Sequence, residues 1–265
     1  MEEMKHELIR IIRVFALPLF LILCSDVHAQ NLNRPIPDKV VVLTFDDAAA
    51  SHYSVAAPLL KRYGFGATFF VCEFPPNFRD SSLYMNWRQI KVLGNMGFEI
   101  ANHTLSHPLL TKLSHDQIDH QIGTIENKFD SMEIDHPVSF AYPASVWNDT
   151  VLSVVKERGY HFARIGGDRT YDPSKDPALL IPSWVMTDST RPHIMNALKE
   201  AKDGKIVVLT IHGVPDAEHP WVTTSSELFG EYMQYLADNH YEVIAMRDLE
   251  KYIHPAGTYP HGKNK

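Results

Sequence analysis

The chain has 265 residues, of which 45% are hydrophobic and 22% are charged, as in an ordinary folded globular protein. This length is enough for one large α/β domain or two small ones. The net charge of −7 and the lack of a basic run argue against a nucleic-acid partner.

Residues 1–29 have the three parts of an export signal. Basic residues precede the apolar run VFALPLFLILC, and a small-residue cleavage pattern ends at Ala29. The run is too short to span a bilayer comfortably, so we expect no stable membrane insertion. We predict cleavage after Ala29, export to a periplasm or the extracellular space, and a single domain over residues 30–265. Lipid attachment at Cys24 is the alternative, but Leu23 is bulkier than such a site normally accepts.

Strand-like apolar runs alternate with amphipathic helical patterns along the rest of the chain. The candidate strands are 39–47, 67–73, 97–103, 138–144, 161–167, 178–186, 205–213 and 241–248, and the helical patterns include 55–64, 87–97, 116–132 and 226–239. Strands that are apolar throughout and alternate with helices are typical of a parallel sheet covered by helices. The pattern therefore predicts an α/β fold, either a barrel or an open sheet.

Polar residues with metal-binding or acid–base chemistry follow several of these strands. The first strand ends in Asp46 and Asp47, the third is followed by His103 and His107, and the seventh ends at His212. In parallel α/β folds the functional groups gather at the C-terminal ends of the strands. We therefore expect these side chains to share one site.

The two adjacent aspartates need an explanation, because like charges repel and each is costly to desolvate. Neighbours on an extended strand point to opposite sides, so either each carboxylate has its own partner in a site or the pair lies in a solvated turn. His103 and His107 are four residues apart, and one helical turn would place both imidazoles on the same side. With one carboxylate they form a set that suits Zn²⁺ or a similar divalent ion.

Three motifs occur in the order seen in a known family. They are TFDD at 44–47, HTLSH at 103–107 and TIH at 210–212, and over about residues 38–252 the chain resembles the polysaccharide deacetylases, the NodB-homology or carbohydrate esterase family 4 domain. The resemblance implies a distorted (β/α) barrel. It also implies a metal-dependent hydrolase that removes acetyl groups, above all N-acetyl groups, from a carbohydrate.

The resemblance also implies roles for individual residues. Asp47, His103 and His107 would bind one divalent metal ion, with Zn²⁺ expected first and Co²⁺, Ni²⁺ or Mn²⁺ as alternatives. The metal would polarise the amide carbonyl and activate the attacking water. Asp46 would act as the general base on that water, and His212 would be the general acid that protonates the departing amine.

The sequence departs from the family pattern at the third motif. Ala141 stands where an arginine usually orients the base, and Ala144 stands where the backbone N–H of an aromatic residue usually faces the oxyanion. Ala144 still supplies an N–H group, whereas Ala141 cannot replace a guanidinium. We predict that Arg164 is the substitute. For the Asp-Trp motif that usually orients the acid, the candidates are Trp184 and Asp188.

Further residues bear on the substrate. Thr210 stands where a leucine is typical, which changes the expected acetyl pocket. Trp147 and Trp221 are candidate stacking platforms for sugars, with loop packing as the alternative, and Tyr142 is a candidate for lining the cleft.

Four functions are consistent with these residues. The leading hypothesis is an exported deacetylase whose partner is an acetylated oligo- or polysaccharide. The alternatives are an O-acetyl polysaccharide esterase, an amidohydrolase acting on a small non-sugar amide, and a carbohydrate-binding homologue with weakened or lost catalysis. Asp46 and His212 argue against the last, because a pure binder needs no base and acid.

Overall fold

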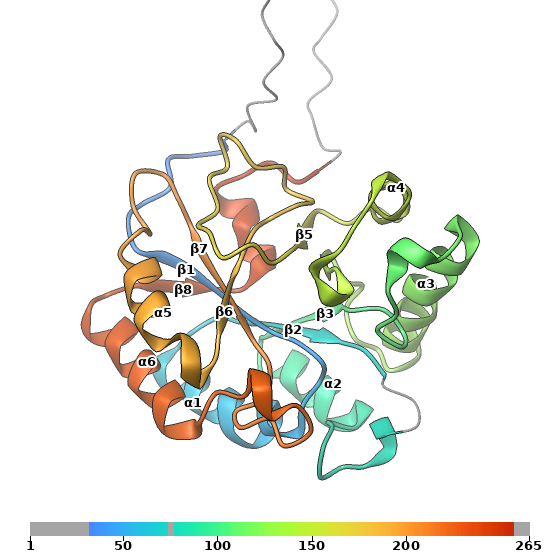
Figure 1. Cartoon of the computed structure of the whole chain (residues 1–265), viewed down its shortest axis with the longest axis horizontal. Coiled ribbons are helices and arrows are strands. Elements are labelled where there is room, and N and C mark those ends of the chain that lie inside the picture. Colours follow the sequence, from blue (N-terminus) through green and yellow to red (C-terminus); the bar gives the residue numbers. More distant parts are fainter. Residues whose placement is uncertain (1–31, 74–76, 257–265) are drawn as a thin grey trace, which may run out of the picture.

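A computed structural model describes residues 32–73 and 77–256. The predicted signal segment at 1–29 lies outside the described residues. Within the described ranges, eight strands form one parallel sheet, and the helices surround it (Figure 1). No helix in these ranges is long and apolar enough to cross a membrane.

The strands coincide with the eight apolar runs predicted from the sequence. They are β1 (Val40–Phe45), β2 (Thr68–Val71), β3 (Glu99–Asn102), β4 (Ser139–Ala141), β5 (Phe162–Arg164), β6 (Trp184–Met186), β7 (Val207–Ile211) and β8 (Glu242–Ile244). The α-helices are α1 (Ala57–Tyr63), α2 (Trp87–Asn95), α3 (His115–Ser131), α4 (Asp149–Glu157), α5 (Arg191–Leu198) and α6 (Ser226–Asp238). A π-helical turn, η1 (His52–Ala56), leads into α1.

The strand order makes the sheet a distorted barrel. Its strands run β5-β4-β3-β2-β1-β7-β6, and β8 pairs with the first half of β1 while β2 pairs with the second half. The segment before β6 returns to β5, where Ile181 N–H donates to Ala163 O and Ile165 N–H donates to Ile181 O, both at 2.8 Å. These bonds bring the two edges of the sheet together, and the predicted barrel is thereby confirmed.

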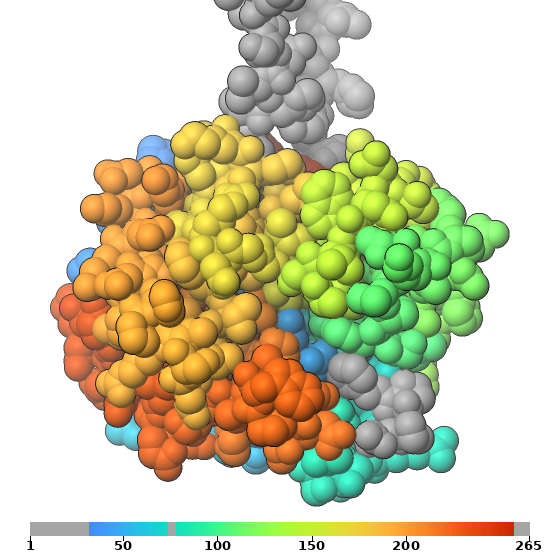
Figure 2. Space-filling model, in the orientation of Figure 1, coloured from blue at the N-terminus to red at the C-terminus, as the bar shows by residue number. Residues whose placement is uncertain are grey.

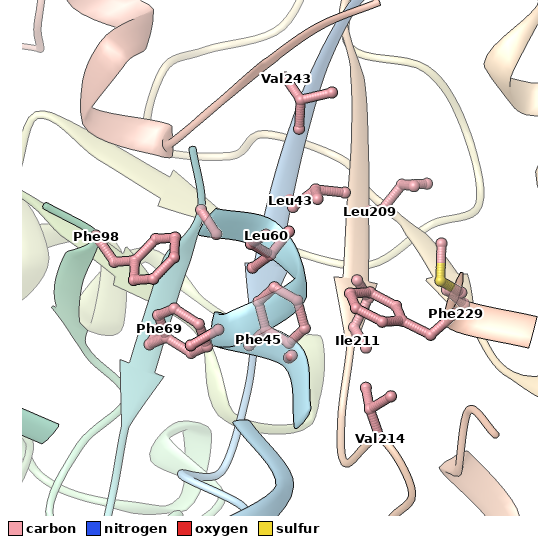
Figure 3. Close-up of a cluster of buried hydrophobic side chains, with 14 of the residues drawn as sticks. Leu43, Phe45, Leu60, Phe69, Phe98, Leu209, Ile211, Val214, Phe229 and Val243 are labelled. Carbon is pink, nitrogen blue, oxygen red and sulfur yellow. The ribbon is translucent and has the colours of Figure 1, made fainter. Parts of the chain in front are cut away.

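Alternating side chains of the strands build two cores. Val41, Leu43 and Phe45 of β1 pack outward against the helices, in a cluster where the Phe45 and Phe69 rings stack 4.8 Å apart (Figure 3). Val40 and Val42 point the other way, into the barrel. Because both faces of β1 are buried, the strand is apolar except at Thr44, whose hydroxyl donates to the Leu209 carbonyl oxygen at 2.7 Å.

Local signals in the sequence begin and end the helices. Asn86 and Ser114 cap α2 and α3, and in each case the glutamine three residues later completes a capping box. Gly64 ends α1 in the left-handed conformation with φ +70°, which glycine adopts without strain. The turn that follows returns the chain to β2.

Candidate active site

A cleft of about 390 Å³ opens at the C-terminal ends of the strands. Figure 2 shows it as a hollow whose floor has the blue colour of the segment that contains β1. Its lining combines residues from the ends of several strands: Asp46, Asp47, His103, His107, Tyr142, Ala144, Ser145, Arg164, Val185, Thr210, His212, His219, Trp221 and Val222. Of the predicted residues, the acid–base and metal candidates, Ala144 and Arg164 therefore all reach one cavity.

The alternation of the strands explains why these side chains converge. Val40 and Val42 face the barrel interior, and Asp46 continues the same inward series beyond the end of β1. Val208 on β7 likewise precedes the inward positions of Thr210 and His212. The periodicity that fills the barrel with apolar side chains thus directs polar ones into its mouth.

Asp47 reaches the same cleft by a change of backbone conformation. Its φ is +71°, in the left-handed region that non-glycine residues seldom adopt. On a continuing strand its carboxylate would point away from that of Asp46. The left-handed residue turns it back, so the two carboxylates lie in one site. Uncommon backbone conformations of this kind often occur at functional sites.

Three side chains form a candidate metal centre. One ligand atom from each of Asp47, His103 and His107 lies within 4.8 Å of the others. Asp47 Oδ1 is 3.5 Å from His103 Nε2 and 3.8 Å from His107 Nε2. Two imidazoles and one carboxylate suit Zn²⁺ and related divalent ions, with a position left for water or substrate.

The two histidines are joined by a loop, and the helical turn considered from their spacing is not formed. Thr104 and His107 both have positive φ, +70° and +51°, and Thr104 Oγ1 accepts a hydrogen bond from His107 N–H at 3.1 Å. The loop places the two imidazole rings edge to face, with centroids 4.7 Å apart. The same pairing is therefore reached by a different local structure.

A backbone contact prepares His103 to bind a metal. Its Nδ1 lies 2.8 Å from the Ala141 carbonyl oxygen, which only accepts, so Nδ1 carries the proton. Nε2 is left with a free lone pair that faces Asp47. Metal-binding histidines are commonly held in this way by a hydrogen bond from the other ring nitrogen.

The electrostatics also fit a cation. Burial and the neighbouring charge of Asp46 raise the pKa of Asp47 to about 8. Burial lowers the pKa of His103 to about 3, so this imidazole is neutral, as a metal ligand must be. A divalent cation between these groups would offset the repulsion of the two carboxylates. The ligand types and charges of this donor set therefore suit a divalent metal ion.

Arg164 lies against Asp46, deep in the barrel. Its Nη2 donates to Asp46 Oδ2 at 2.5 Å, and its Nη1 donates to Thr210 Oγ1 at 2.7 Å. Only 2% of Arg164 is exposed. Burial alone would raise the pKa of Asp46, but the charges of Arg164 and of the nearby histidines lower it below its ordinary value. Asp46 is thus held as a carboxylate, and its Oδ1 has no hydrogen-bond partner among the described residues.

His212 lies on the other side of the aspartate pair, with Nε2 3.8 Å from Asp47 Oδ2. Its Nδ1 is buried and has no hydrogen-bond partner in the described part of the chain. Burial lowers the pKa of His212, although the charges of Asp46 and Asp216 oppose this. Among the described residues, no carboxylate therefore hydrogen-bonds to Nδ1, where the family pattern expects the orienting group.

Trp184 and Asp188, the candidates for that orienting place, are occupied elsewhere. Trp184 is absent from the cleft lining; its indole N–H donates to Thr170 Oγ1 at 3.3 Å, while its neighbour Val185 faces the cleft. Alternation along β6 accounts for this difference. Asp188 accepts hydrogen bonds from the backbone and hydroxyl of Ser225, the N-cap of α6. The assignment of these residues to the acid is therefore corrected.

A contact that the sequence did not reveal holds the end of β7. Ser51 Oγ accepts from Val214 N–H at 2.7 Å, and His52 Nε2 lies 2.8 Å from the carbonyl oxygen of His212. Because that oxygen only accepts, His52 Nε2 is the donor. The two side chains thus hydrogen-bond to the backbone on both sides of Gly213. A serine–histidine pair in an alanine-rich stretch carries no sequence signal for a contact with residues about 160 positions away.

Comparisons with known proteins point to one family. A family model described as polysaccharide deacetylase matches residues 33–163, which include both aspartates and the histidine pair of the metal centre. The chain is 28% identical over 123 residues to the putative polysaccharide deacetylase YxkH of Bacillus subtilis, covering 46% of this chain and 43% of YxkH. It is 25% identical over 221 residues to a peptidoglycan-N-acetylglucosamine deacetylase of Bacillus cereus, covering 83% of this chain and 92% of that enzyme.

The solved structures show the same fold. The CE4 domain of a multidomain xylanase from the hindgut metagenome of Trinervitermes trinervoides superposes with a TM-score of 0.58 at 22% identity, covering 81% of this chain and 91% of that domain. The chain spans less than half the length of YxkH but most of the Bacillus cereus enzyme. From its motifs, fold and these matches, the chain belongs to the polysaccharide deacetylase family.

Proposed function

We propose that this protein is an exported, metal-dependent hydrolase that removes N-acetyl groups from an acetylated oligo- or polysaccharide. The proposal rests on two features that share one cleft. The first is the candidate ligand set of Asp47, His103 and His107. The second is the ion pair of Asp46 and Arg164. A binding protein needs no carboxylate held ionised beside a metal centre, so their combination supports turnover.

Asp47, His103 and His107 would hold one divalent ion, with Zn²⁺ proposed first. When bound, the metal supplies polarisation of the acetyl carbonyl and a lowered pKa for a water molecule. The protein supplies the proton transfers and the positioning, which depend on its own side chains.

Asp46 is the proposed general base. Its lowered pKa keeps it ionised at neutral pH, and Arg164 holds Oδ2, so that the unpartnered Oδ1 is free to accept a proton from the attacking water. Ala144, which lines the cleft with φ +53°, would offer its N–H to the developing oxyanion. His212 would return a proton to the leaving group.

A second function, removal of O-acetyl groups, is favoured by the surroundings of His212. This histidine has no partner for Nδ1 among the described residues, and burial lowers its pKa, so it is a weakly supported acid. An amine leaves poorly unless it is protonated, whereas a sugar alkoxide depends less on an acid. An esterase would therefore tolerate this arrangement better than an amidase.

A panel of acetylated substrates tests both functions. Acetate release by the metal-reconstituted protein would be compared on N-acetylglucosamine oligomers, acetylated xylo-oligosaccharides and 4-nitrophenyl acetate, with Asp46→Asn as the inactive reference. Release from N-acetylated sugars supports the deacetylase, and release from O-acetylated sugars alone supports the esterase. Absence of metal-dependent release from all three would exclude both.

A further inference from the structure

One reactive side chain near the mouth of the barrel has no part in the proposed mechanism. Cys72 follows the last residue of β2, and it is the one cysteine among the described residues. Phe70, two positions earlier, points into the inner core, so alternation directs Cys72 to the same side. The thiol is fully buried, and its Sγ lies 3.6 Å from Asp47 Oδ1. Cys72 therefore contacts the candidate metal centre from within the barrel.

The contact involves the carboxylate oxygen that would bind the metal. Asp47 Oδ1 is the oxygen that lies 3.5 Å from His103 Nε2 and 3.8 Å from His107 Nε2. An ionised carboxylate oxygen only accepts, so the S–H group of Cys72 is the donor. Each such oxygen has about two acceptor positions, so one can receive the thiol while the other binds a cation. Among the described residues, this is the one hydrogen bond made to the Asp47 side chain.

The two adjacent aspartates are held by donors of different kinds. Asp46 receives the charged guanidinium of Arg164, which competes with a metal ion for its negative charge. Asp47 receives a neutral thiol, a weak donor that fixes the direction of the carboxylate and leaves its charge for a cation. The backbone of Asp47, at φ +71°, has already left the strand, so a side-chain contact has to orient its carboxylate. This difference matches the roles proposed for the two residues, base and ligand.

We propose that Cys72 is a positioning residue for the metal centre: its S–H group holds Asp47 Oδ1 toward the two histidines and does not itself bind the metal. This inference rests on the proposed function, which needs the metal. The neighbouring ligand is held in a similar way, since His103 Nδ1 donates to the Ala141 carbonyl oxygen at 2.8 Å. Loss of such an outer contact typically weakens metal binding about 10–100-fold, and a thiol, as a weak donor, belongs at the lower end.

Cys72→Ala and Cys72→Ser form a matched pair, because they leave almost the same space and differ by one hydroxyl group. Zn²⁺ affinity, measured by competition with a chromophoric chelator, should fall about tenfold in Cys72→Ala. Cys72→Ser should stay nearer to wild type than to Cys72→Ala, since its O–H group can donate to Asp47. Val71→Ala is the control for stability: Val71 packs in the outer core, so this variant should unfold more easily but keep the Zn²⁺ affinity of wild type.

Replacement of Zn²⁺ by Co²⁺ distinguishes a positioning residue from a ligand. A thiolate bound to Co²⁺ gives an intense charge-transfer absorption in the near ultraviolet, and we expect none in the wild-type protein. The proposal is overturned if this absorption is present and is lost in Cys72→Ser, because Cys72 would then be a ligand. It is also overturned if Cys72→Ala binds Zn²⁺ as tightly as wild type, or if Cys72→Ser binds it as weakly as Cys72→Ala.

An equal loss of Zn²⁺ affinity in Val71→Ala would overturn the proposal as well, because the effect would then come from the stability of the fold. A wild-type protein that binds no divalent metal would count against the proposed function itself and would remove this inference with it. The two failures are therefore distinguishable by the metal content of wild type.

Discussion

Ala141 and Arg164 face each other across the ladder between β4 and β5, in direct register. The family's third motif usually places its arginine at the position of Ala141. Here the guanidinium comes from the residue paired with Ala141 on the neighbouring strand, and it donates to Asp46 Oδ2 at 2.5 Å. Because parallel neighbours point their side chains to the same face, an arginine on either strand can reach the same carboxylate.

Removing Arg164 should reduce the rate without removing the metal. Arg164→Met keeps most of the side-chain volume but leaves Asp46 buried without its counter-charge, which also costs about 3–5 kcal/mol of stability. We expect kcat to fall about 10²–10⁴-fold, because the base loses its orientation and its lowered pKa. Kinetics and metal content of the purified variant are the measurements.

The register pair also offers a rescue of a lost arginine, with Arg164→Ala as the single-variant reference. In the double variant Ala141→Arg, Arg164→Ala, the guanidinium would return to the family's usual strand, and part of the lost rate should return. Ala141→Arg alone is the control, since overpacking of the barrel should lower both its stability and its rate below those of wild type. Full activity of Arg164→Met would refute the role given to this arginine.

Removing metal ligands should empty the metal centre. His103→Ala and His107→Ala should each abolish tight binding, since two protein ligands rarely hold Zn²⁺ well. Metal per chain would be measured by elemental analysis after dialysis. His120→Ala is the matched control, because His120 is exposed on α3 and should leave the metal in place. A stoichiometric metal in the double variant of His103 and His107 would contradict the assignment.

Metal binding should depend on pH through Asp47. Its pKa in the metal-free fold is raised to about 8 from an ordinary value of 3.8, so at neutral pH it holds a proton that the metal must displace. Affinity should therefore rise as pH increases toward about 8 and fall below it. Calorimetry at pH 7 in two buffers of different ionisation enthalpy would count the released protons, and Asp47→Asn should release fewer.

The same shift has a consequence for stability. Between the two pKa values the folded metal-free protein binds a proton that the unfolded chain has released, so the free energy of unfolding should fall as pH rises toward about 8. Saturating metal should remove this part of the pH dependence. Thermal unfolding at several pH values, with and without Zn²⁺, gives the comparison.

His212 should matter more for amides than for esters. His212→Ala should retain the metal but lower N-acetyl hydrolysis more than hydrolysis of 4-nitrophenyl acetate, whose leaving group needs no proton. Since burial lowers the pKa of His212 below its ordinary value of 6.5, the amide reaction should already decline as pH rises from the mildly acidic range toward neutrality. Equal losses on amide and ester, across this pH range, would remove the case for a dedicated acid.

His52 should act on the reaction through the backbone of His212. It is fully buried between Phe45 and Phe69, and burial lowers its pKa to about 4, so the neutral ring donates from Nε2 to the carbonyl oxygen of His212. His52→Phe leaves that oxygen without its partner, at a cost of about 1–3 kcal/mol. We expect a loss in kcat of about tenfold with unchanged metal content, and partial recovery in His52→Gln, which retains a donor.

An effect of His52→Phe on unfolding alone, with kcat unchanged, would make this contact purely structural. Ser51→Ala gives a milder second variant, because it removes only the acceptor for Val214 N–H. A parallel loss of kcat in both variants would assign the effect to the end of β7.

The strands and the membership of the candidate metal centre follow from local patterns. A strand with both faces buried is mostly apolar, so all eight runs were visible in the sequence. Asp46 and His212 were predictable as neighbours because parallel strands bring their C-terminal ends to one edge. Arg164 was recognised as a candidate because the third motif lacks its arginine, and the structure places it in contact with Asp46.

Only the tertiary structure decided the contacts that depend on the closure of the barrel and on loop conformation. The left-handed φ of Asp47 turns its carboxylate beside that of Asp46, which no strand pattern predicts. The face of β6 that meets the cleft carries Val185, so Trp184 lies outside it. His52 reaches His212 across 160 positions of sequence. Periodicity records which residues are buried, but the partner of a polar atom is set by how the barrel brings distant segments together.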